Sequence, residues 1–83
     1  MYAVQKLLWD VRREASLAAR FRAEPDAVLD EYGIGGRERE AMRALDLRTL
    51  YDCGANPYLL YFCALQLGVP RQEYYARIRG ERP

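Results

Sequence analysis

Histidine is absent from this chain of 83 residues, and cysteine occurs only twice, as Cys53 and Cys63. Without histidine the chain cannot supply a Ser–His or Cys–His nucleophile pair. It cannot supply the two histidines of a facial-triad iron site, and two cysteines with carboxylates make an unfavourable zinc site. The sequence therefore predicts no metal site and no catalytic residue in this chain acting alone.

The sequence also lacks a disulfide framework, a signal peptide and a membrane-spanning segment. The cysteines lack CxxC spacing, and a lone pair is a poor disulfide framework, so we interpret both as small buried hydrophobic residues. Residues 1–10 show no basic region followed by an apolar stretch and a small-residue cleavage site. No apolar run approaches the roughly 20 residues of a membrane span. We therefore expect no membrane association and a cytoplasmic location.

A strong excess of either charge is also missing. The 13 lysine and arginine residues nearly cancel the 12 aspartate and glutamate residues, and the two signs are mixed along the chain. Nucleic-acid binding draws on a clear basic excess. The composition therefore predicts no nucleic-acid partner.

Strand-forming residues are scarce, with four valines, two isoleucines and one threonine. No stretch alternates between polar and apolar residues with period two. Apolar residues instead recur at helical spacing between glycine and proline corners. The sequence predicts an all-α fold, a compact bundle of six or seven short helices in one domain over residues 1–83.

The first helices follow from apolar stripes. One stripe comprises Val4, Leu7, Leu8 and Val11. Trp9 lies beside it and is favoured as a core anchor over a surface hot spot, whereas Arg12, Arg13 and Glu14 are expected to point outward. Leu17 and Phe21 continue the apolar face, and Ser16 either begins a new helix or lies inside a continuous one.

Proline and glycine mark the later helices. Pro25 begins a helix that Gly33 ends, because proline suits the first helical turn and glycine a left-handed cap. A helix over Arg37–Leu45 precedes one capped by Asp46, for which Leu47, Leu50 and Tyr51 are expected to point inward. Val69-Pro70 begins the last helix, which extends to Arg79. We expect Glu81-Arg82-Pro83 to be loose.

The helix expected over residues 57–67 differs from the others because Gln66 is its only strongly polar residue. Asn56-Pro57 predicts its start, since the asparagine side chain can accept a free backbone N–H. A helix that is apolar all round is central or is covered by something else. We expect it to be the central helix of the bundle, with part of its surface facing a partner.

Aromatic residues supply the candidate binding residues, because aromatic side chains are enriched at protein interfaces. The chain has seven tyrosines, four of them in its last third. The candidates for a substrate-pocket or partner-facing surface are Asn56, Tyr58, Tyr61 and Phe62. Tyr74 and Tyr75 are further candidates for a partner-facing surface.

The order and spacing of several segments resemble a known family. These segments are Phe21, Glu24-Pro25-Asp26-Ala27-Val28-Leu29, Glu31-Tyr32-Gly33-Ile34, Glu38-Arg39-Glu40-Ala41, Asp46, Leu50-Tyr51 and Gly54-Ala55-Asn56-Pro57-Tyr58-Leu59-Leu60. Over about residues 17–70 they resemble the small (alpha, LigA-type) subunit of extradiol ring-cleavage dioxygenases such as protocatechuate 4,5-dioxygenase. Asn56 departs from the pattern, because the family often has a histidine there.

The resemblance implies a non-catalytic helical subunit that docks on a larger catalytic subunit. That partner would hold iron(II) through two histidines and a carboxylate, and this chain would hold no cofactor. The small subunit would help to close the aromatic-substrate pocket, with residues near Asn56, Tyr58, Tyr61 and Phe62.

Two alternatives remain open. The helical domain also resembles the recognition domain of borosin-type precursor peptides, which docks on a peptide-modifying enzyme without catalysis. That function requires a core peptide after the domain, and the 83 residues contain none. Alternatively, the exposed aromatic residues pair two copies of the chain in a homodimer.

Overall fold

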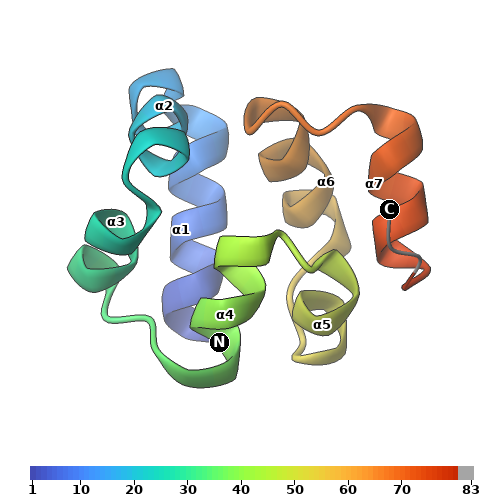
Figure 1. The fold of residues 1–83 in the computed structure, drawn as a ribbon, viewed down its shortest axis with the longest axis horizontal. Helices are drawn as coiled ribbons and strands as arrows, with labels where there is room; N and C mark the ends of the chain where they lie inside the picture. The colour runs from blue at the N-terminus through green and yellow to red at the C-terminus, as the bar shows by residue number, and fades with distance from the viewer. Residues whose placement is uncertain (81–83) are drawn as a thin grey trace.

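The computed structural model describes residues 1–80 as a bundle of seven α-helices without strands in that range (Figure 1). The all-α prediction is therefore confirmed, whereas the expected loose segment Glu81-Arg82-Pro83 lies outside the described residues. The helices are α1 (Tyr2–Arg13), α2 (Ala15–Ala23), α3 (Pro25–Tyr32), α4 (Gly36–Ala44), α5 (Leu47–Asp52), α6 (Pro57–Gln66) and α7 (Arg71–Ile78).

The contact between α1 and α6 forms the centre of the bundle. Helices α2 and α3 pack against α1, α5 and α7 contact α6, and α4 joins the two groups through α3 and α5 (Figure 1). The helix after Pro57 thus shares the central position with α1 and is not enclosed on all sides. This agrees with the small size of the chain, since a domain of about 80 residues has a thin core.

The buried core follows the predicted apolar stripes in most places. The stripe of α1 is fully buried, as are Leu29, Met42, Leu50 and Leu60. The prediction for Trp9 is wrong, because 43% of its surface is exposed. Trp9 lies one residue beyond Leu8, a rotation of about 100° around the helix, and this places it at the edge of the stripe. Tyr51 is likewise exposed, with Arg48 over its ring at 5.9 Å.

Helix boundaries match the proline and glycine pattern closely. Pro25 is the first residue of α3, and Gly33 ends α3 in the left-handed conformation, with φ of 69°. The open question around Ser16 is resolved by Glu14, whose extended backbone (φ −126°, ψ 105°) separates α1 from α2. Ser16 therefore lies inside α2.

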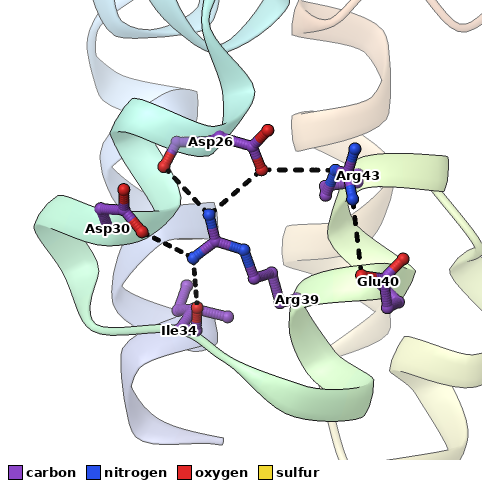
Figure 2. A network of polar contacts seen from close by, with 6 residues as sticks. All are labelled: Asp26, Asp30, Ile34, Arg39, Glu40 and Arg43. Atoms are coloured by element: carbon purple, nitrogen blue, oxygen red, sulfur yellow. Dashed lines mark hydrogen bonds and ion pairs between the residues drawn. The ribbon is translucent and has the colours of Figure 1, made fainter.

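Helices α3 and α4 are tied together by Arg39 (Figure 2). Its Nη1 donates to Asp30 Oδ1 at 2.7 Å and to the carbonyl of Ile34 at 3.1 Å, and its Nη2 lies 3.1 Å from Asp26 Oδ1. Arg43 lies at the edge of the same network, with Nε 3.3 Å from Asp26 Oδ1. One guanidinium thus contacts both turns of α3 and the loop that follows it.

Helix α4 ends at Leu45, whose φ of 51° is left-handed and unusual for a residue with a side chain. Arg77 of α7 covers this end, since its Nη1 donates to the carbonyls of Ala44 and Leu45 at 3.3 Å and 3.2 Å. A cation at the carboxyl end of a helix also stabilises the helix dipole.

Candidate functional site

The start of α6 is fixed by Asn56, as its sequence predicts. Its Oδ1 accepts hydrogen bonds from the backbone N–H of Tyr58 at 2.8 Å and of Leu59 at 3.4 Å. The backbone N–H of Asn56 donates to Gln5 Oε1 at 3.1 Å, which links this turn to α1. The side-chain oxygen of Asn56 is therefore occupied by the helix that it caps.

Helix α6 carries no charge on any side. Residues 53–70 contain no aspartate, glutamate, lysine or arginine. Leu60, Cys63 and Ala64 form the buried side, while Tyr58 is 56% exposed. The surface of α6 that remains outside the core is thus aromatic and neutral.

The exposed and half-buried rings form a connected series across α6 and α7. Ring centroids lie 4.7 Å apart for Tyr58 and Phe62, 5.4 Å for Tyr61 and Phe62, and 6.5 Å for Tyr61 and Tyr75. We call the surface formed by Trp9, Tyr58, Tyr61, Phe62 and Tyr75 the aromatic face. The contacts of Phe62 with Tyr58 and with Tyr61 are edge-to-face, and contacts of this kind fix the rings relative to one another.

Tyr74 does not belong to the aromatic face, and its assignment as partner-facing is corrected by its burial. It is only 5% exposed, and its hydroxyl donates to the carbonyl of Pro57 at 3.2 Å. Its ring contacts that of Tyr61 at 5.0 Å, and burial raises the pKa of its hydroxyl. Tyr74 thus packs α7 onto α6, whereas its neighbour Tyr75 is exposed.

Arg12 is the residue that the sequence analysis missed. Its guanidinium lies over the rings of Trp9, Tyr58 and Phe62, at 5.5 Å, 5.3 Å and 4.9 Å from their centroids. Cation–π contacts are favourable at such distances. The contact between Arg12 and Trp9 could be predicted from the sequence, because residues three apart are neighbours on a helix. The contacts to α6 depend on how the two helices pack.

The described part of the chain offers little for redox or acid–base chemistry. Residues 1–80 contain no group of three histidine, cysteine, aspartate or glutamate side chains that could hold a metal ion. Burial raises the pKa of the Cys63 thiol to about 12, so this sulfur is protonated and unsuited to metal binding or nucleophilic attack. These residues do not fit an iron(II) centre.

A short, partly buried hydrogen bond between two ionisable side chains joins α3 to α1. The hydroxyl of Tyr32 in α3 donates to Asp10 Oδ2 in α1 at 2.6 Å. Burial and this hydrogen bond raise the pKa of Tyr32, so its proton stays in place at neutral pH. The pair thus fastens α3 to α1.

Two surface hollows lie away from the aromatic face. One, of about 190 Å³, is lined by residues that include Phe21, Arg43 and Leu67, and is smaller than typical ligand pockets. A second lies beside Tyr2 and Tyr32. Among residues 1–80, no helix has the length and apolarity to cross a membrane.

Comparison with known proteins agrees with the resemblance noted from the sequence. Gallate dioxygenase from Pseudomonas putida (strain KT2440) is 34% identical over 62 residues, which are 75% of this chain but only 18% of that relative. No solved structure matches the chain. The family model for the LigA subunit of the aromatic-ring-opening dioxygenase LigAB matches residues 4–82. The chain therefore belongs to the LigA family.

Proposed function

We propose that this chain is a non-catalytic subunit of an aromatic-ring-opening dioxygenase. It docks through the aromatic face onto a larger polypeptide that holds iron(II), and it helps to close the pocket for the aromatic substrate. Asn56, Tyr58, Tyr61 and Phe62 line or border that pocket, and Tyr75 extends the contact with the partner. Family membership supports the type of enzyme, because the family is named for one subunit of a two-subunit dioxygenase.

The observation that carries the docking role is the aromatic face itself. Three of its five rings are among the exposed large hydrophobic side chains, and they lie beside a helix without charge. Contiguous apolar surface of this kind marks interaction sites, and aromatic side chains with arginine dominate binding energy at interfaces. The matched stretch is 18% of the gallate dioxygenase chain, so in that relative it is joined to a much longer polypeptide.

The mechanism that we propose for this chain is packing. An apolar surface laid over a substrate pocket excludes water and strengthens the electrostatic interactions inside it. Any metal chemistry belongs to the partner, since the residues described in this chain do not fit an iron site. The chain contributes by positioning rings and by removing solvent.

Reconstitution tests the proposal. The chain is purified with and without the large-subunit homologue encoded in the same genome, and the partner is loaded with iron(II). Ring opening of gallate and of protocatechuate is followed by substrate absorbance and oxygen uptake. We expect a stable complex and a rate of ring opening that rises roughly tenfold when the chain is present, about 1.4 kcal/mol in the barrier.

The control is the same partner mixed with chain that has been denatured. A partner that opens the ring at the same rate with and without this chain, and that forms no complex with it, would overturn the proposed function. The recognition-domain alternative is not favoured by the family or by the relative.

A further inference from the structure

Arg12 is a cation held on the aromatic face without a counter-charge. It is half-buried near the carboxyl end of α1, with its guanidinium over rings from α1 and α6. No ion pair among residues 1–80 involves Arg12. Burying a charge in an interface is unfavourable unless it is paired there.

The segment of α6 over which Arg12 lies supplies no carboxylate either. Helix α6 and its flanking turns, residues 53–70, are free of charged side chains. Two other arginines border this region. Arg22 Nη1 donates to the carbonyl of Gln66 at 2.9 Å, and Arg71 lies over the ring of Tyr75 at 5.8 Å. Neither forms an ion pair with a carboxylate in the described chain, so the charge that borders the aromatic face is positive.

Acidic side chains form their ion pairs in other parts of the fold. Asp26 and Asp30 of α3 pair with arginines of α4, and Glu73 pairs with Arg77 within α7. The net charge of the chain is only +1. The positive border of the aromatic face therefore reflects how charges are distributed and not a general basic excess.

We infer that the partner places a carboxylate, flanked by apolar side chains, on the guanidinium of Arg12. This inference rests on the proposed function and names the chemistry of the partner's contact surface. A guanidinium stacked on rings keeps its N–H edges available for a carboxylate, which it binds in a planar, two-pronged geometry. The surrounding rings exclude water and so strengthen the pair. The partner is the larger polypeptide, because the LigA family is one half of a two-subunit assembly.

Substitutions at two neighbouring arginines test this contact. Arg12→Gln removes the charge, Arg12→Glu reverses it and Arg12→Lys keeps it while losing the flat stacking surface. Arg13→Gln and Arg13→Glu are matched controls, because Arg13 is exposed on the same turn of α1 and takes part in none of the cation–π contacts among residues 1–80. Affinity for the large-subunit homologue is measured by calorimetry at low and high salt, after circular dichroism has shown that each variant is helical.

We expect Arg12→Gln to weaken binding roughly tenfold or more, Arg12→Glu to weaken it further and Arg12→Lys to lie between wild type and Arg12→Gln. The Arg13 variants stay within about threefold of wild type. Salt weakens the wild-type complex more than the Arg12→Gln complex, because screening acts on the pair. An Asp or Glu of the partner changed to Arg restores binding to Arg12→Glu and identifies the carboxylate.

Each other outcome has a definite meaning. If the wild-type chain binds the homologue and Arg12→Gln binds it with the same affinity, the carboxylate contact is overturned and the proposed function stands. A wild-type chain that does not bind the homologue overturns both. A homodimer that Arg12→Glu dissociates would make a second copy the occupant, which also overturns the inference. If Arg12→Gln is not helical, the test relies on Arg12→Lys and on the salt titration of the wild-type complex. Wild-type affinity of Arg12→Lys, together with a wild-type complex that salt does not weaken, would overturn the inference.

Discussion

At the scale of single residues, a few side chains fix the position of α6, and each does so in a different way. Asn56 caps the first turn of α6, and Tyr74 packs α7 against α6. Cys63 lies on the side of α6 that faces the core. None of these side chains belongs to the aromatic face, although Asn56 and Tyr74 were predicted to be binding residues. The residues that position the face are thus separable from those that form it.

Replacing the cap tests this division. Asn56→Ala leaves two backbone N–H groups of α6 without an acceptor, so we expect the free energy of unfolding to fall by about 1 kcal/mol in urea denaturation. Asn56→Asp is the matched control, because aspartate caps equally well and favours the positive end of the helix dipole. Equal stability of Asn56→Ala and wild type would show that the cap contributes nothing.

The buried thiol predicts a pH dependence of stability. The pKa of Cys63 is raised to about 12 in the folded chain, whereas an unfolded thiol has a pKa of about 8.5. The folded state thus favours the protonated form. Its contribution to stability is complete below about pH 8.5 and is lost as pH rises toward 12, by up to about 1.4 kcal/mol per pH unit.

We expect this decline in denaturant titrations between about pH 8.5 and pH 10, before the tyrosines of the unfolded chain ionise. Cys63→Ala should flatten it, and the matched Cys53→Ala should keep it, because Cys53 is only half-buried. A steep decline that persists in Cys63→Ala would assign the pH dependence to another group.

At the scale of helices, Arg39 is the main polar connection between α3 and α4. It is the least exposed arginine of the network in Figure 2, and it contacts Asp26, Asp30 and the carbonyl of Ile34. Arg43 contacts Asp26 from a more exposed position. The two arginines therefore differ in their solvent access while sharing one partner.

We expect Arg39→Gln to lower the Tm more than Arg43→Gln, because exposed ion pairs contribute little and Arg39 loses backbone and carboxylate acceptors together. Thermal unfolding followed by circular dichroism measures both variants. High salt should narrow the difference. Equal Tm values would mean that Arg39 contributes no more to stability than the more exposed Arg43.

Whether the ends of a helix could be predicted from the sequence differs from one helix to another. Pro25, Gly33 and Asn56 act within their own turns, so the ends of α3 and the start of α6 could be predicted from local sequence. The break between α1 and α2 carries no proline or glycine, and only the backbone of Glu14 reveals it.

Side-chain exposure was harder to predict than helix ends. Tyr74 and Tyr75 are adjacent and chemically identical, and their different burial follows from how α7 lies on α6. The same holds for Arg12, whose contacts with Tyr58 and Phe62 cross between two helices. Periodicity defines the faces of one helix but not which neighbour covers each face.

At the scale of the whole molecule, the exposed rings of the aromatic face lie outside the buried core. Tyr58 is more than half exposed, so removing its ring sacrifices little core packing. Tyr2, which is 81% exposed, makes none of the ring contacts of the aromatic face. The two tyrosines therefore offer a comparison of binding and stability.

We expect Tyr58→Ala to weaken the complex with the large-subunit homologue about tenfold while changing the free energy of unfolding by less than about 0.5 kcal/mol. Tyr2→Ala should leave both quantities near wild type. Affinity is measured by calorimetry and stability by urea denaturation. An equal loss of affinity in both variants would place the contact elsewhere on the surface.

The charges beside the aromatic face also bear on symmetry. A two-fold pairing uses the same patch on both copies, so each side must complement itself. Here both copies would bring Arg12, Arg22 and Arg71, and residues 53–70 would bring no acid to meet them. Like charges brought together oppose association. This face is therefore a poor partner for itself, and its charge favours a different polypeptide over a second copy.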